Sequence, residues 1–141
     1  MLRSRSWLSG WKLLPISSCS HQEVLDIFAR SSIYLSFGHP EGFGLPVAEA
    51  MASRCAVVGY TGLGGRELFN RAELYKCAVA VEFGDWLGFI DGLAFIHHRL
   101  IYQEEEVNYQ LSSLSAEIIQ SYGPFACSNA LKAAISSLSL L

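Results

Sequence analysis

The 141-residue sequence is poor in charge: charged side chains make up only 16% of it, and the net charge is -3. This mild acidity argues against binding to the phosphate backbone of nucleic acid, which needs clustered Lys and Arg. The sequence also lacks a run of roughly 18 apolar residues that would span a membrane. Residues 87–101 come closest, but Asp91 and Arg99 interrupt them. We therefore expect a soluble protein with no transmembrane segment, folded as a single domain over residues 1–141.

Cysteine is scarce and scattered, and the four residues form no C-x-x-C pair and no His/Cys cluster: Cys19, Cys55, Cys77 and Cys127. Metal and disulfide chemistry are therefore not expected. Cys55 and Cys77 lie in apolar runs, where a thiol behaves as a small hydrophobic group. A reducing cytoplasm is the expected location. The basic start is not followed by the apolar segment of a secretory signal, so we interpret it as the edge of a domain.

Short apolar runs alternate with helical patterns along the first part of the chain. Strands are expected at 11–16, 33–37, 55–59 and 76–83. A Ser20–Glu23 capping box predicts a helix start, and Leu45-Pro46 predicts a second helix that ends near Ser53. Strands that are apolar on both faces are typical of a parallel sheet covered by helices. The predicted fold is α/β, with a small Rossmann-like parallel sheet, flanking helices and a helical C-terminal cover over 85–141.

Two glycine-rich loops, 38–44 and 61–65, follow successive strands of this predicted sheet. Loops that follow parallel strands emerge at the same edge, so we expect the two loops to open into one crevice. Gly42 and Gly44 allow the backbone to approach a ligand closely, and the helix that follows directs free N–H groups toward it. A phosphate is the natural ligand, although a simple turn would have the same composition.

Glu49 is the one polar residue in the stretch from Leu45 to Ala52. One interpretation is a surface glutamate that favours the start of a helix. The other is a partly buried carboxylate, which needs hydrogen-bond donors such as the two hydroxyls of a ribose. The sequence alone favours neither interpretation.

A longer pattern connects these features. Residues 41–52 read EGFGLPVAEAMA and are followed by Ala56-Val-Val and by Gly64-Gly-Arg-Glu67. This pattern resembles the donor-binding half of the GT-B glycosyltransferases, in particular the retaining group 1 (family 4) enzymes with two glutamates separated by seven residues. The likeness is strongest over residues 21–69, so the chain resembles part of the C-terminal donor-binding domain.

The resemblance implies transfer of a hexose from a nucleoside diphosphate sugar to an acceptor hydroxyl, without a metal or other cofactor. The absence of Asp-x-Asp agrees with metal independence. By position, Glu41 is the implied catalytic residue that accepts from sugar hydroxyls, and Glu49 holds the ribose. The other implied donor-binding residues, which offer backbone amides or border the pocket, are Gly42, Phe43, Gly44, Leu45, Gly64 and Gly65.

The sequence also departs from the family pattern. Nothing before His21 matches the Arg and Lys that neutralise the donor diphosphate in the family, and nothing before it matches the family's acceptor-binding domain. This departure leaves an alternative, a noncatalytic module that binds nucleotide sugar or another protein. The missing half would then come from a separate acceptor-domain chain, or the apolar surface would be covered by self-association.

Overall fold

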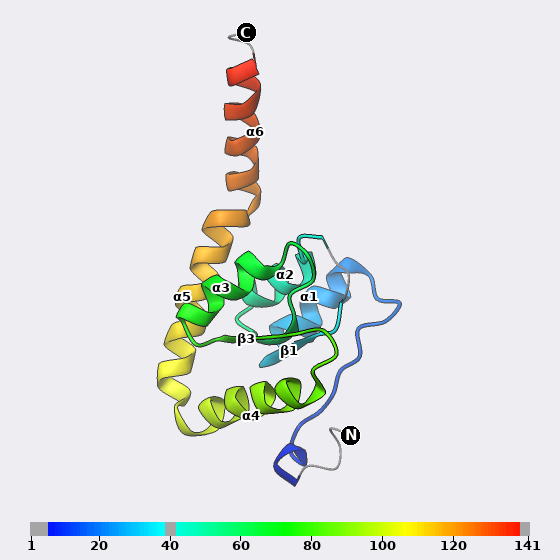
Figure 1. Ribbon diagram of the computed structural model, residues 1–141. Coiled ribbons are helices and arrows are strands. Elements are labelled where there is room, and N and C mark those ends of the chain that lie inside the picture. The colour runs from blue at the N-terminus through cyan, green and yellow to red at the C-terminus, as the bar shows by residue number, and fades with distance from the viewer. Residues whose placement is uncertain (1–5, 39–41, 139–141) are drawn as a thin grey trace.

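A small parallel sheet organises the fold. The computed structural model describes residues 6–38 and 42–138 (Figure 1). Its strands are β1 (Ile33–Ser36), β2 (Ala56–Tyr60) and β3 (Ala78–Val81), in the spatial order β1-β2-β3. Ile33 pairs with Ala56 and Val57 pairs with Ala78, so both ladders are parallel. The strands predicted at 33–37, 55–59 and 76–83 are thereby confirmed within a few residues.

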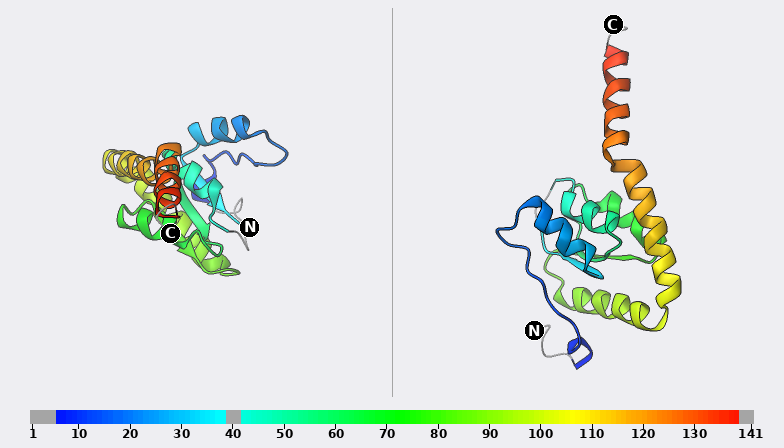
Figure 2. Two further views of the ribbon diagram at one scale, coloured as in Figure 1. Left: turned by 90° about the horizontal axis from the view of Figure 1, so that it is seen from above. Right: turned by 180° about the vertical axis from the view of Figure 1, so that it is seen from behind.

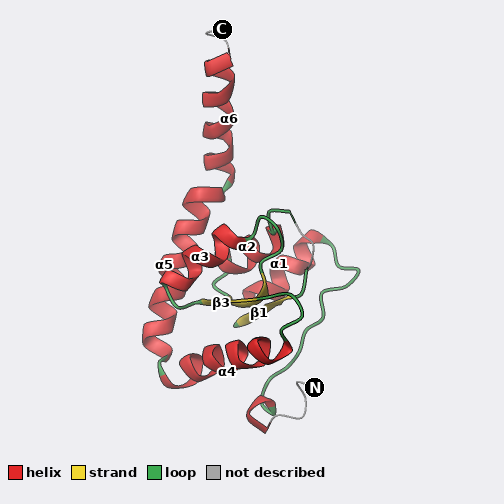
Figure 3. Ribbon diagram, viewed as in Figure 1, coloured by secondary structure: helices red, strands yellow, loops and turns green. Residues whose placement is uncertain are grey.

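Helices cover both faces of this sheet (Figure 3). α2 (Leu45–Ala52) and α3 (Arg66–Leu74) pack on one face, and α4 (Trp86–Tyr102) packs on the other. Every residue of the central strand β2 is buried, as its unbroken apolar sequence requires. The predicted α/β class with a Rossmann-like parallel sheet is confirmed.

α1 (His21–Ala29) begins at the predicted capping box. The Glu23 amide donates to the Ser20 hydroxyl at 3.4 Å, and the Ser20 amide donates to the Glu23 carboxylate at 2.7 Å. These hydrogen bonds hold the pKa of Glu23 below its usual value, because the Ser20 hydroxyl and amide both favour the charged form. Phe28 on α1 is fully buried, which fixes this helix beside α2.

The strand predicted at residues 11–16 is wrong. A 3-10 helix, η2 (Ser6–Leu8), precedes the segment, and the described residues between it and α1 form no strand. Pro15 has no N–H to donate to a ladder. The Trp11 indole instead donates to His97 Nδ1 on α4 at 3.0 Å, which fixes the segment by a side chain.

The chain ends in two helices, α5 (Glu104–Tyr122) and α6 (Pro124–Leu138). α5 packs against α2 and α4 through a buried stripe formed by Val107, Leu111, Leu114 and Ile118. α6 continues beyond it and extends away from the sheet, as Figure 1 and the right-hand view of Figure 2 show. Its Phe125 and Leu131 side chains are exposed. The predicted helical cover therefore holds for α4 and α5, whereas α6 does not cover the sheet.

Candidate functional site

The two glycine-rich loops meet at the carboxyl edge of the sheet. The first loop follows β1 and the second follows β2, and these strands are neighbours. The Gly64 amide donates to the Gly42 carbonyl oxygen at 2.7 Å. A Cβ at Gly64 would clash with this same carbonyl, so only glycine permits the close approach. The prediction that the loops converge is confirmed.

The N-terminus of α2 opens into this meeting point. Gly44 is the N-cap residue, and its φ of 83° lies in the left-handed region that favours glycine. Within the described part of the chain, the amides of Phe43, Gly44 and Leu45 donate to no protein acceptor. Amides without a described acceptor at the positive end of the helix dipole make this junction a candidate anion site.

Glu49 lies one helical turn beyond these amides. Its side chain is 28% exposed, which fits the interpretation of a partly buried carboxylate. The imidazole of His21, at the start of α1, lies beside it, with Nδ1 3.7 Å from Glu49 Oε1. No described residue donates a hydrogen bond to the carboxylate, so its oxygens are available to a ligand.

The remaining predicted residues divide into three groups. Glu41 lies outside the described residues, so the structure gives no position for it relative to Glu49. Gly42, Phe43, Leu45 and Gly64 are exposed, whereas Gly44 between them is buried. Gly65 is buried as the N-cap of α3 and lies against Gly44, so it shapes the junction of the loops from behind.

A side chain that the sequence analysis missed lies behind the first loop. The ring of Tyr122, at the end of α5, lies 5.2 Å from the ring of Phe43. Its hydroxyl donates to Glu67 on α3 at 2.6 Å. This bond and one from Arg71 hold the pKa of Glu67 below its usual value. Since Tyr122 follows a separate helical pattern, no local motif connects it to the loop.

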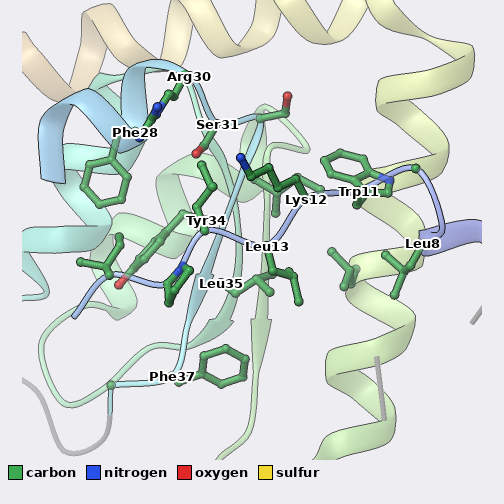
Figure 4. A pocket seen from close by; sticks show the side chains of 18 residues that line it. Leu8, Trp11, Lys12, Leu13, Phe28, Arg30, Ser31, Tyr34, Leu35 and Phe37 are labelled. Atoms are coloured by element: carbon green, nitrogen blue, oxygen red, sulfur yellow. The ribbon is translucent and has the colours of Figure 1, made fainter. Parts of the chain in front are cut away.

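A cavity of about 950 Å³ lies along the outer side of β1 (Figure 4). Its lining comes from the segment before α1, from the end of α1 and from β1, and includes Trp11, Arg30 and Tyr34. Phe37 and Gly38 connect this cavity to the start of the first loop. The lining includes none of Gly42, Gly44 and Gly64, so the cavity and the junction of the loops are formed by different residues.

The described residues contain no group of three His, Cys, Asp or Glu side chains placed to hold a metal ion. Among the same residues, no helix has the length and apolar character needed to cross a membrane.

All four cysteines are free thiols. Cys55 and Cys77 are buried in the apolar core, as expected of small apolar residues. Their burial raises the pKa of Cys55 to about 12 and that of Cys77 to about 11.

The sheet, its covering helices and the joined loops define a Rossmann-like α/β domain, a class that binds ligands beyond the carboxyl ends of its strands. Comparison with known families identifies the family to which the chain belongs. The family model of glycosyl transferases group 1 matches residues 13–106, and the chain belongs to this family. The match includes both glycine-rich loops and Glu49.

Two curated relatives are similar to parts of the chain. The Alpha-1,6-glucosyltransferase of Actinobacillus pleuropneumoniae serotype 7 (strain AP76) is 34% identical over 73 residues, which cover 52% of this chain and 20% of the relative. The "Putative glycosyltransferase ORF330" of Acidianus filamentous virus 2 (isolate Italy/Pozzuoli) is 40% identical over 40 residues, which cover 28% of this chain and 12% of the relative. The matched segments are therefore a small part of each relative. No solved structure matches the chain.

Proposed function

We propose that this chain is part of a donor-binding domain and that its joined loops bind the diphosphate of a nucleotide sugar. The observation that carries the proposal is the 2.7 Å hydrogen bond from Gly64 to Gly42, which brings both loops to the N-terminus of α2. Membership of the glycosyl transferases group 1 family supports the sugar nucleotide as the ligand. The glucosyltransferase name of one relative makes glucose a reasonable first sugar to test.

Each part of the ligand has a proposed partner. The amides of Phe43, Gly44 and Leu45 would donate to the diphosphate, whose negative charge suits the helix N-terminus. Glu49 would accept hydrogen bonds from the ribose hydroxyls, because its carboxylate has no described donor of its own. Gly64 and Gly65 would border the same pocket. Glu41, the proposed catalytic residue, would accept from hydroxyls of the hexose.

The proposed reaction is glycosyl transfer by the whole protein to which this domain belongs. The bond between the anomeric carbon and the diphosphate oxygen breaks, and a bond to the acceptor oxygen forms with retained configuration. The acceptor hydroxyl gives up its proton, and the nucleoside diphosphate leaves with the electron pair of the broken bond. Backbone amides at the α2 N-terminus would stabilise the charge that grows on this leaving group, so no metal ion is required.

Calorimetric titration tests the binding part of the proposal. UDP, GDP and ADP are titrated separately into the chain, once with EDTA and once with MgCl₂. We expect at least one nucleotide to bind, with an affinity that is the same in both buffers. No heat of binding at millimolar nucleotide would contradict the proposal, and binding only with MgCl₂ would contradict metal independence.

The catalytic part needs a second assay with UDP-glucose and a panel of acceptor alcohols. Product formed with the same anomeric configuration as the donor, measured by NMR, would support retaining transfer. Nucleotide binding without any turnover would restrict this chain to donor binding and leave transfer to the longer protein. Product with inverted configuration would contradict the proposed mechanism.

A further inference from the structure

Tyr122 contacts the first glycine-rich loop from the far end of the fold. It is the last residue of α5, and its ring lies 5.2 Å from the Phe43 ring with an interplanar angle of 53°. Phe43 is 38% exposed, so the ring of Tyr122 covers a side chain that otherwise faces solvent. Tilted aromatic pairs of this kind are favourable beyond the burial of their surface. The contact therefore opposes movement of the loop at the residue before Gly44.

Tyr122 is itself held from two sides by α3. Its hydroxyl donates to Glu67 at 2.6 Å, and the Arg71 guanidinium lies 5.5 Å from the centre of its ring. Arg71 in turn donates to Glu67 at 3.1 Å and to Glu117 of α5 at 2.9 Å. Each of these groups has a charged or aromatic partner, so the ring of Tyr122 has a defined position.

The same arrangement reaches the second loop. Glu67 lies in the first turn of α3, directly after Gly64 and Gly65. Tyr122 thus contacts the first loop through Phe43 and the end of the second loop through Glu67. On the ligand side the two loops are joined by the hydrogen bond from Gly64 to Gly42. The loops are consequently connected on two sides, once by backbone and once by Tyr122.

We propose that Tyr122 is a positioning residue for the diphosphate site, where its ring sets the position of the Phe43 and Gly44 amides. This inference rests on the proposed function. Tyr122 touches no ligand in this proposal and acts through Phe43. The ring is the part that matters for the loop, whereas the hydroxyl anchors the ring to Glu67.

Three variants distinguish the contribution of the Tyr122 ring from that of its hydroxyl. Tyr122→Leu removes the ring, and Tyr122→Phe keeps the ring but removes the hydrogen bond to Glu67. Tyr75→Phe is the matched control, because the Tyr75 hydroxyl donates to Glu117 at 2.8 Å across the same α3–α5 junction without contacting the loop. Each variant is titrated with the nucleotide, among UDP, GDP and ADP, that wild type binds most tightly.

We expect Tyr122→Leu to weaken nucleotide binding about ten-fold, the ratio that corresponds to an aromatic pair at the upper end of its usual range. Tyr122→Phe should lose about three-fold or less, and Tyr75→Phe should bind as wild type does. Unchanged binding in Tyr122→Leu would overturn the inference. An equal loss in Tyr75→Phe would also overturn it, because the effect would then be general loosening of the junction.

Hydrogen exchange gives a readout that needs no ligand. The Gly64 amide, which donates to Gly42, should exchange faster in Tyr122→Leu than in wild type or Tyr75→Phe. If wild type binds no nucleotide, the proposed function fails, yet this exchange difference still decides whether Tyr122 positions the loop. Equal exchange in all three proteins would overturn the positioning role while leaving the nucleotide proposal intact.

A second pair of variants keeps the test decisive if Tyr122→Leu folds poorly. Phe43→Leu removes the same contact from the loop side, where the side chain is already partly exposed. It should speed exchange at Gly64 and weaken nucleotide binding to the same extent. Where Tyr122→Leu does fold, the double variant should lose no more than either single variant, since both remove one contact. Additive losses would show that the two rings act independently and would overturn the inference.

Discussion

Two regions of the molecule differ in how their polar groups are hydrogen-bonded. One is the junction of α4 with α5, and the other is the pair of glycine-rich loops. At the junction, the Arg99 side chain is buried, with 4% of the residue exposed. Its guanidinium donates to the Lys76 carbonyl oxygen at 2.6 Å and to the side chains of Gln103 at 2.9 Å and Gln110 at 2.7 Å. It also donates to the Glu106 carboxylate at 3.3 Å. At the loops, the amides of residues 43–45 have no described acceptor. The donors of Arg99 are therefore hydrogen-bonded within the protein, whereas the amides of the loop have no partner among the described residues.

The difference shows how a small domain separates stability from binding. A buried guanidinium is tolerated only when its donors are paired, so the Arg99 junction is specific and fixed. Unpaired amides cost little where water reaches them, and Phe43 and Leu45 are exposed residues whose amides water can hydrate until a ligand binds. Substitutions at the junction should therefore change the free energy of unfolding, and substitutions at the loops should change nucleotide affinity.

The largest expected effect is at the junction. Arg99→Met would remove a guanidinium that is 4% exposed and would leave the Lys76 carbonyl, Gln103 and Gln110 without their donor. It should lower the free energy of unfolding by about 3 kcal/mol. Urea denaturation measures this loss. Arg30→Met is the control, since Arg30 is exposed at the C-cap of α1, and should change stability by less than about 0.5 kcal/mol. A loss of similar size in both variants would contradict the special role of the Arg99 junction.

Glu49 should show the opposite behaviour. Glu49→Ala should weaken nucleotide binding by roughly 1.5–3 kcal/mol, the range of a hydrogen bond to a charged group. Its stability should change little, because the His21 partner is 70% exposed and such pairs contribute little. Calorimetric titration and urea denaturation measure the two quantities. Glu105→Ala, which removes the same charge from an exposed position on α5, should leave the affinity unchanged.

Much of the fold could be predicted from local patterns. The Ser20–Glu23 capping box and the apolar run of β2 are signals within a few residues, and each gave the correct element. The convergence of the loops followed from the rule that parallel strands end at one edge. No element was predicted at Arg66–Leu74, where α3 lies between two strands. The signal was present but was not recognised: Leu68, Phe69 and Ala72 recur at helical spacing and are buried.

The contacts that complete the structure could not be predicted, because they join residues distant in sequence. Nothing around Arg99 indicates that its guanidinium is buried against the Lys76 carbonyl. Likewise, Tyr122 and Phe43 meet only after α5 has packed beside α3. The segment at 11–16 was apolar enough for a strand, but a side-chain bond from Trp11 fixes it without a ladder. These outcomes depend on tertiary packing rather than on local propensity.

Two glycines allow effects on stability to be separated from effects on nucleotide binding. Gly44 and Gly84 have nearly the same left-handed φ, 83° and 89°, and a Cβ fits at both without a clash. Alanine at either position should lower the free energy of unfolding by about 1–2 kcal/mol through backbone strain. Only Gly44→Ala should also weaken nucleotide binding, since Gly44 belongs to the anion site. Equal effects of both substitutions on affinity would place the nucleotide elsewhere.

The smallest expected effect concerns Glu117, which joins α3 to α5. Hydrogen bonds from Tyr75 and Arg71 hold the pKa of Glu117 below its usual value. Between the lowered pKa and the usual one, the unfolded chain binds more protons than the folded chain, so stability rises with pH across this window.

Wild type should therefore be more stable than Glu117→Gln at pH 7, and this advantage should shrink as the pH falls below about 4.3, the usual value for glutamate. Thermal unfolding of both proteins at a series of pH values from 7 to 3 measures the difference. Glu105→Gln is the control, and its difference from wild type should stay small at every pH because Glu105 is exposed. A difference for Glu117→Gln that does not change with pH would show that the carboxylate charge contributes nothing to this junction. At pH 7, Glu117→Gln should bind nucleotide with the same affinity as wild type, since Glu117 lies behind the loops and does not reach the unpaired amides.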